Sequence, residues 1–163
     1  MNMVHNKAIF EQRGFLNILQ TFSEFKEKDV WIDQAMKIST ENLLAQTTTD
    51  GVQREWCGGY HSGVYIDGLE ISRRMKDLDT EMPEVFDRRL KSMADHIFGL
   101  STPDLGFPMF GDTARPKQFS EDRKDWQLYN TLINASEEFG DEKYRALAEL
   151  QESKLPPNGS TAF

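Results

Sequence analysis

The sequence lacks several features by which common classes of protein are recognised. Its 163 residues include one cysteine, Cys57, so no disulfide can form within the chain, and a small apolar side chain is the expected role of this residue. The three histidines are scattered and form no metal-ligand spacing with that cysteine, so we expect no metal and no other cofactor. No apolar run is long enough to cross a membrane, and the first residues do not resemble a signal peptide.

Basic charge is also scarce. The formal net charge is -8 and the isoelectric point is about 4.9. A nucleic acid or an anionic membrane recruits concentrated lysine and arginine, so we expect neither as a partner. On net charge alone an acidic polysaccharide is disfavoured as well. The mean hydropathy of -0.61 indicates one domain with a modest core.

What the sequence does contain is helical periodicity. Apolar residues recur at helical spacing in six segments: about 7–22, 29–46, 60–77, 83–98, 120–139 and from 141 onward. No strand pattern of useful length appears. The sequence therefore predicts an all-α fold of antiparallel helical hairpins over residues 1–154, followed by a non-helical tail at 155–163.

The periodicity also predicts which side chains face the core. In the first segment the expected stripe comprises Glu11, Phe15, Ile18, Leu19 and Phe22, which places a carboxylate on the apolar face. Asp29 is the expected N-cap of the second segment, whose face carries Trp31, Ala35, Ile38 and Ala45. The third and fourth stripes are Val64, Gly68, Ile71, Met75 and Leu78, and Phe86, Leu90, Met93 and Ile97.

A polar loop between the second and third segments is the place where we look for chemistry. Residues 47–59 contain an Asp50-Gly51 turn and the pair Gly58-Gly59, and they deliver Tyr60 and His61 to a helix start. Both side chains can give or take a proton. The structural alternative is a helix anchor with a buried ring.

Three runs in this order resemble the heparinase II/III family of polysaccharide lyases. They are residues 6–14 (NKAIFEQRG), residues 22–26 (FSEFK), and residues 50–55 (DGVQRE) leading to Gly59-Tyr60-His61. Pro103-Asp104, Gly106, Pro108 and Gly111-Asp112 are also similar to the family. The resemblance covers nearly the whole chain.

The resemblance implies an architecture larger than the chain. Such enzymes have an incomplete (α/α) toroid of helical hairpins followed by a β-sandwich, with the cleft between them. We therefore expect a fragment of the toroid, with the β-sandwich absent and needed as a partner, so that the fragment is inactive or nearly so. The full-length protein is expected to be periplasmic or secreted.

The implied reaction is β-elimination on an acidic polysaccharide that contains uronic acid, such as a glycosaminoglycan or alginate. Asn6 matches the family position that stabilises the charge developing on the uronate carboxyl group. Tyr60 matches the catalytic tyrosine, acting as acid, base or both. His5, Glu11, Glu55, His61 and Asp112 are candidate substrate-binding residues near the same cleft.

Each of these residues also has a structural interpretation. Asn6 is a common helix cap, His61 can orient the loop, Asp112 lies in a turn, and Glu11 and Glu55 can serve as structural carboxylates. His96, inside the fourth segment, is expected to be a packing or surface residue. Two other classes stay open. A helical glycoside hydrolase would pair Glu11 with Glu55 or Asp112, and a non-catalytic helical-repeat module would need no such residues.

Overall fold

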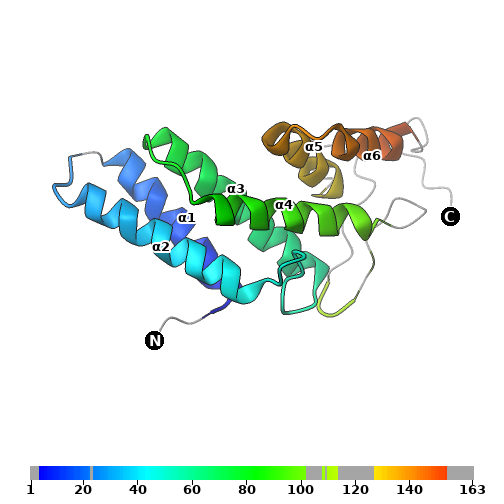
Figure 1. Cartoon of the computed structure of the whole chain (residues 1–163), viewed down its shortest axis with the longest axis horizontal. Helices are drawn as coiled ribbons and strands as arrows, with labels where there is room; N and C mark the ends of the chain where they lie inside the picture. The colour runs from blue at the N-terminus through cyan, green and yellow to red at the C-terminus, as the bar shows by residue number, and fades with distance from the viewer. Residues whose placement is uncertain (1–3, 23, 102–107, 109, 114–126, 154–163) are drawn as a thin grey trace.

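The computed structural model describes residues 4–22, 24–101, 108, 110–113 and 127–153, with the backbone alone for 127 and 151–153. Within these residues the chain forms six helices and no strand, which confirms the predicted all-α fold (Figure 1). The helices are α1 (Asn6–Thr21), α2 (Lys28–Gln46), α3 (Gly58–Asp77), α4 (Glu84–Gly99), α5 (Gln127–Phe139) and α6 (Glu142–Ser153). The expected tail at 155–163 lies outside the described residues, and so does the expected start of the fifth helix near residue 120.

Consecutive helices form antiparallel hairpins, and alternate helices run parallel. His61 and Gly68 of α3 meet Met93 and Leu90 of α4, so the two sequence numbers change in opposite directions along this pair. Between α3 and α5 they change together, since Arg73 bonds to Asn134 and Lys76 to Glu138. Helices α1, α3 and α5 therefore run in one direction, and α2, α4 and α6 return in the other (Figure 1).

The third and fourth helices supply the centre of the core as their periodicity predicts. Val64, Gly68, Ile71 and Met75 of α3 are buried, and the α4 stripe is completely buried: Phe86, Leu90, Met93 and Ile97. Gly68 allows close packing here, because a Cβ at this position would lie 2.5 Å from the Cδ2 atom of Leu90.

The predicted buried face of α1 is only partly right, because Leu19 is buried and Phe15 packs against the core as predicted, but other members of the stripe are exposed. Ile9, Leu16 and Leu19 are fully buried, whereas Ile18 and Phe22 are about half exposed. Glu11 is exposed and does not share the apolar face. The sequence offers two overlapping apolar stripes on this helix, and the packing of α1 against α2 and α3 selects the one that contains Leu16.

The second helix also differs from its prediction at both its start and its face. Asp29 lies within the first turn, and Glu27 is the N-cap residue, without a side-chain cap. Ala35 is buried as predicted, but Ala45 is exposed, and the buried face includes Ile32 and Leu43.

No helix among the described residues combines the length and the apolar character that a bilayer-spanning segment requires.

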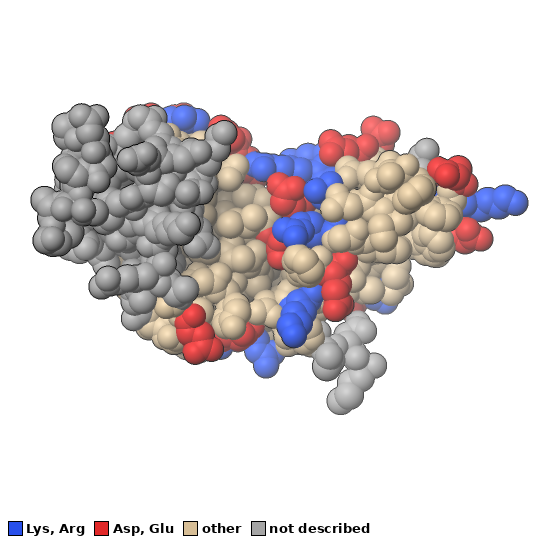
Figure 2. Space-filling model, turned by 180° about the vertical axis from the view of Figure 1, so that it is seen from behind, with Lys and Arg blue, Asp and Glu red and all other residues tan. Residues whose placement is uncertain are grey.

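Charged side chains of both signs alternate in a band across the back of the molecule (Figure 2). Ion pairs of this kind join the parallel helices, including Arg13 of α1 with Asp67 of α3, and Lys76 of α3 with Glu138 of α5 at 2.7 Å. In these pairs each Arg or Lys side chain is neutralised by a carboxylate. The paired cations therefore do not form a free basic surface.

Candidate active site and its neighbouring pocket

The loop between α2 and α3 is a tight structure fixed against α4. Thr47 and Gln53 form an antiparallel bridge, and the amide of Gly51 donates to the carbonyl of Thr48 at 3.0 Å, which confirms the predicted turn. Gly51 has φ +87°, and a Cβ there would lie 2.2 Å from the carbonyl carbon and oxygen of Ser92. Only glycine allows this turn to rest on the α4 backbone.

Two further contacts hold the loop from its polar side. The guanidinium of Arg89 in α4 donates to the hydroxyl of Thr47 at 2.9 Å and also to its carbonyl. The buried amide of Gln53 bonds twice to Glu55, donating from Nε2 to the carboxylate at 3.0 Å and accepting from its backbone N–H at 2.8 Å. Glu55 is exposed, and its contact with Gln53 gives it a structural role in shaping the loop.

The start of α3 is completed by a distant turn. Cys57, the N-cap residue, gives no side-chain cap; instead the N–H of Gly58 donates to the hydroxyl of Thr113 at 2.9 Å. That hydroxyl donates in turn to the carbonyl of Phe110 at 2.6 Å. Gly111 lies so close to the carbonyl of Trp56 that a Cβ would approach it to 2.9 Å. Residues 110–113 are therefore packed onto the start of α3. No local sequence pattern predicted this contact.

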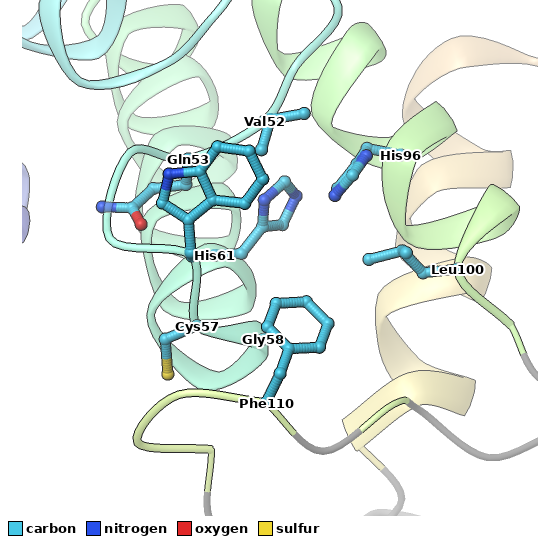
Figure 3. A pocket seen from close by; sticks show the side chains of 9 residues that line it. Val52, Gln53, Cys57, Gly58, His61, His96, Leu100 and Phe110 are labelled. Atoms are coloured by element: carbon cyan, nitrogen blue, oxygen red, sulfur yellow. The ribbon is translucent and has the colours of Figure 1, made fainter.

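A pocket of about 140 Å³ lies between this loop, the start of α3 and the end of α4. In Figure 3 the ring of Phe110 lies below the ring of His61, and the ring of His96 lies beside that of His61. The walls are mainly apolar and aromatic. The lining residues are Val52, Gln53, Trp56, Cys57, Gly58, His61, His96, Leu100 and Phe110.

The two histidines of the pocket are electrically neutral at pH 7. Nε2–H of His61 donates to the carbonyl of Met93 at 3.1 Å, which leaves Nδ1 as an acceptor. Burial lowers the pKa of His61 to about 4, because the charged imidazolium loses its hydration. The His96 ring lies 5.0 Å from the His61 ring, and burial also lowers the pKa of His96.

Asn6 and Tyr60 lie in the first turns of two parallel helices. Two side-chain contacts set the register of α1 against α3, Arg13 with Asp67 and Gln20 with Arg74, and each joins residues 54 positions apart. Continued to the first residues of both helices, the same offset would bring Asn6 level with Tyr60. Tyr60 is 40% exposed, so its phenol is accessible there.

The other predicted site residues are distributed around this end of the fold. His5 is the N-cap residue of α1, and its buried Nδ1 has no hydrogen-bond partner in the described structure. Glu11 is exposed one turn into α1, and Asp112 is exposed in the turn that packs on α3. Of the predicted residues only His61 lines the pocket.

Sequence reasoning missed Trp56 and Phe110 of the pocket wall and undervalued His96. The predicted loop contained Trp56 without assigning it a role, and Phe110 comes from a segment without helical periodicity. No group of three or more potential metal ligands occurs among the residues that the structure describes.

These features define an all-α domain built from helical hairpins. Its candidate functional groups lie around the N-terminal ends of α1 and α3. The chain belongs to the heparinase II/III family of polysaccharide lyases, because the family model described as Heparinase II/III N-terminus matches residues 2–140. The predicted family is thereby confirmed.

Two relatives carry the name heparin-sulfate lyase. The protein from Pedobacter heparinus is 26% identical over 111 residues, which cover 66% of this chain and 17% of that protein. The protein from Bacteroides thetaiotaomicron is 26% identical over 148 residues, covering 85% of this chain and 20% of that protein. The chain thus spans at most about a fifth of either relative's length. No solved structure matches the chain.

Proposed function

We propose that the chain supplies the helical part of a polysaccharide lyase that cleaves a uronic-acid-containing polysaccharide by β-elimination. The observation that supports the proposal is the register of α1 and α3, whose 54-residue offset would bring Asn6 level with Tyr60 at the same end of two neighbouring helices. In this proposal the amide and the phenol face one sugar ring.

The reaction assigns different tasks to these two groups. The C5 proton of a uronate becomes acidic enough to remove only when charge on the adjacent carboxyl group is stabilised. The Asn6 amide offers N–H donors for this purpose. Tyr60 then protonates the departing O4 or, as phenolate, removes the C5 proton, according to the stereochemistry of the sugar.

The supporting residues are assigned more modest roles. His5, Glu11 and Asp112 are proposed to contact sugar hydroxyls at the edge of the site. Glu55 and His61 are proposed to act mainly by shaping the loop before Tyr60, since the carboxylate accepts from Gln53 and the imidazole donates to Met93. The toroidal arrangement, a β-sandwich partner that completes the site, the need of the helical part for that partner, and a periplasmic or secreted location belong to the same proposal.

The test is an ultraviolet assay for unsaturated uronate ends. The gene product that contains the chain is incubated with heparan sulfate, alginate and related polyuronates. Tyr60→Phe is expected to lower kcat by about 10²–10⁴-fold, the usual contribution of a proton-transfer group. Asn6→Ala is expected to cost about 10²–10³-fold, as for other groups that stabilise a developing anion.

Two variants on the same helices provide matched controls. Tyr65→Phe removes a buried hydroxyl without a hydrogen-bond partner, and Asn17→Ala changes an exposed amide further along α1. Both are expected to retain turnover. Equal loss of activity in Tyr65→Phe and Tyr60→Phe would show that the phenol of Tyr60 has no special role. New reducing ends without ultraviolet absorbance would indicate a hydrolase, which contradicts elimination.

A further inference from the structure

Trp56 is exposed in an unfavourable backbone conformation. Its side chain is 69% exposed, and its φ of +51° lies in the left-handed region that bulky residues rarely occupy. The conformation is maintained by the turn at Gln53, whose carbonyl accepts from the N–H of Trp56 at 3.2 Å, and by Gly111 packed on its carbonyl. Strain of this kind at the rim of a pocket is commonly associated with function.

Three other exposed aromatic residues, Phe10, Phe22 and Phe25, have ring or cation–π partners that Trp56 lacks. The guanidinium of Arg13 covers the ring of Phe10 at 4.7 Å, and the rings of Phe22 and Phe25 pack together at 6.1 Å. Trp56 makes no aromatic or cation–π contact with any described residue. Its indole is therefore available to a ligand.

The chemistry of the pocket wall limits what this ligand can be. No lysine or arginine is among the described lining residues, and His61 is neutral at pH 7 because its pKa is about 4. Sulfate or carboxylate groups would lose hydration there without gaining a counter-charge. The apolar C–H face of a sugar ring suits the aromatic and aliphatic walls, and Nδ1 of His61 can accept from a hydroxyl group.

The pocket lies on the other side of α3 from the Asn6 position. His61 faces α4 through its bond to Met93, whereas residues in register with Tyr60 along α3, such as Asp67 and Arg74, face α1. A linear saccharide that crosses the N-terminal end of α3 would meet both sides. The pocket is then a neighbour of the reaction centre along the polymer.

We propose that this pocket is a sugar-binding subsite in which Trp56 stacks on the apolar face of an unsulfated pyranose ring. The inference rests on the proposed function, since it places the subsite beside the ring that reacts at Asn6 and Tyr60. It adds a specificity: the sugar at this position carries neither a sulfate nor a carboxylate group.

The experiment measures binding of defined oligosaccharides to the chain by calorimetry and tryptophan emission. The probes are a saturated, unsulfated tetrasaccharide in which uronate alternates with an uncharged sugar, and its sulfated counterpart. Trp56→Leu is expected to raise Kd for the unsulfated probe about tenfold, as the loss of a stacked aromatic face implies. Trp56→Phe should remain within about threefold of the unaltered chain, because a ring is restored.

Phe22→Leu is the matched control, since it removes another exposed aromatic ring, 47% exposed, from α1. It should leave Kd unchanged. Three results would overturn the subsite: no binding of either probe at millimolar concentration, equal Kd for Trp56→Leu and the unaltered chain, or tighter Trp56-dependent binding of the sulfated probe.

Turnover by the gene product separates this inference from the proposed function. Trp56→Leu should raise KM with little change in kcat, whereas Tyr60→Phe should lower kcat. Trp56-dependent binding with no turnover on any polyuronate would refute the lyase and leave the subsite. Tyr60-dependent turnover with an unchanged KM in Trp56→Leu would refute the subsite and leave the lyase.

Discussion

The buried His61 should make the folded domain sensitive to mild acid. The unfolded chain protonates this histidine near its ordinary pKa of 6.5, whereas in the folded protein burial lowers the pKa to about 4. Between these values the unfolded state binds a proton that the folded state does not. The contribution of His61 to the free energy of unfolding is therefore fully present above about pH 6.5, and it is lost progressively as the pH falls towards 4.

The magnitude follows from the size of the pKa difference. One pKa unit corresponds to about 1.4 kcal/mol, so His61 alone should cost about 2 kcal/mol between pH 7 and pH 5, and about 3 kcal/mol when the pH reaches 4. A domain of this size has a free energy of unfolding of roughly 5–15 kcal/mol. The expected loss is therefore easily measured.

The assay is urea unfolding, followed by far-ultraviolet circular dichroism, for the unaltered chain and His61→Gln at pH 7, 6 and 5. Glutamine keeps an N–H donor for the Met93 carbonyl but does not titrate. The pKa values of Asp67 and Asp87, raised by burial, affect both proteins and cancel in the difference.

The expected difference has a definite sign. His61→Gln should lose about 2 kcal/mol less stability than the unaltered chain between pH 7 and pH 5. Parallel pH profiles for the unaltered chain and His61→Gln would refute the argument that burial keeps His61 neutral.

Two predictions concern the backbone around the site. Gly51→Ala should lower the free energy of unfolding by more than about 2 kcal/mol in the same urea assay, because φ is +87° and the added Cβ would overlap the Ser92 backbone; an unchanged midpoint would contradict the close approach. Asp79→Gly should raise the melting temperature through about 1 kcal/mol of added stability, because Asp79 has φ +55°, a conformation that glycine adopts without strain. The conformation is held where the N–H of Thr80 donates to the carbonyl of Met75 at 2.9 Å. Asp79→Ala keeps the strain and should not raise the melting temperature.

The elements that sequence reasoning predicted best are those with one unambiguous apolar stripe. The stripe of α4 has no competitor, and each of its four predicted residues is fully buried. In α1 the residues Phe15, Leu16, Ile18 and Leu19 form overlapping stripes, so periodicity alone does not choose the buried face. Packing against α3 makes that choice, and local sequence does not encode it.

The site divides in the same way. The loop, its turn and the delivery of Tyr60 and His61 to a helix start follow from local signals such as Asp50-Gly51. The pocket does not, because the hydroxyl of Thr113 meets the N–H of Gly58 across 55 positions of sequence. Contacts of this range depend on the whole fold, and Phe110 reaches the pocket only through them.

The net charge of -8 argues against an acidic substrate only if the charge is evenly distributed, and the hairpins distribute it unevenly along the helix axes. Neither α1 nor α3 has an acidic residue in its first turn, and the described part of α5 has none in its first turn either. Their antiparallel partners begin with Asp29 in α2, Glu84 in α4 and Glu142 in α6. The partial positive charge of a helix N-terminus, worth about 0.3–1 kcal/mol to a nearby anion, thus meets no first-turn acid in α1 and α3, although the exposed carboxylates of Glu55 and Asp112 lie at the same end. In the proposed function, this end is the one that an acidic polymer would approach, because the opposite ends of the hairpins carry acidic first turns.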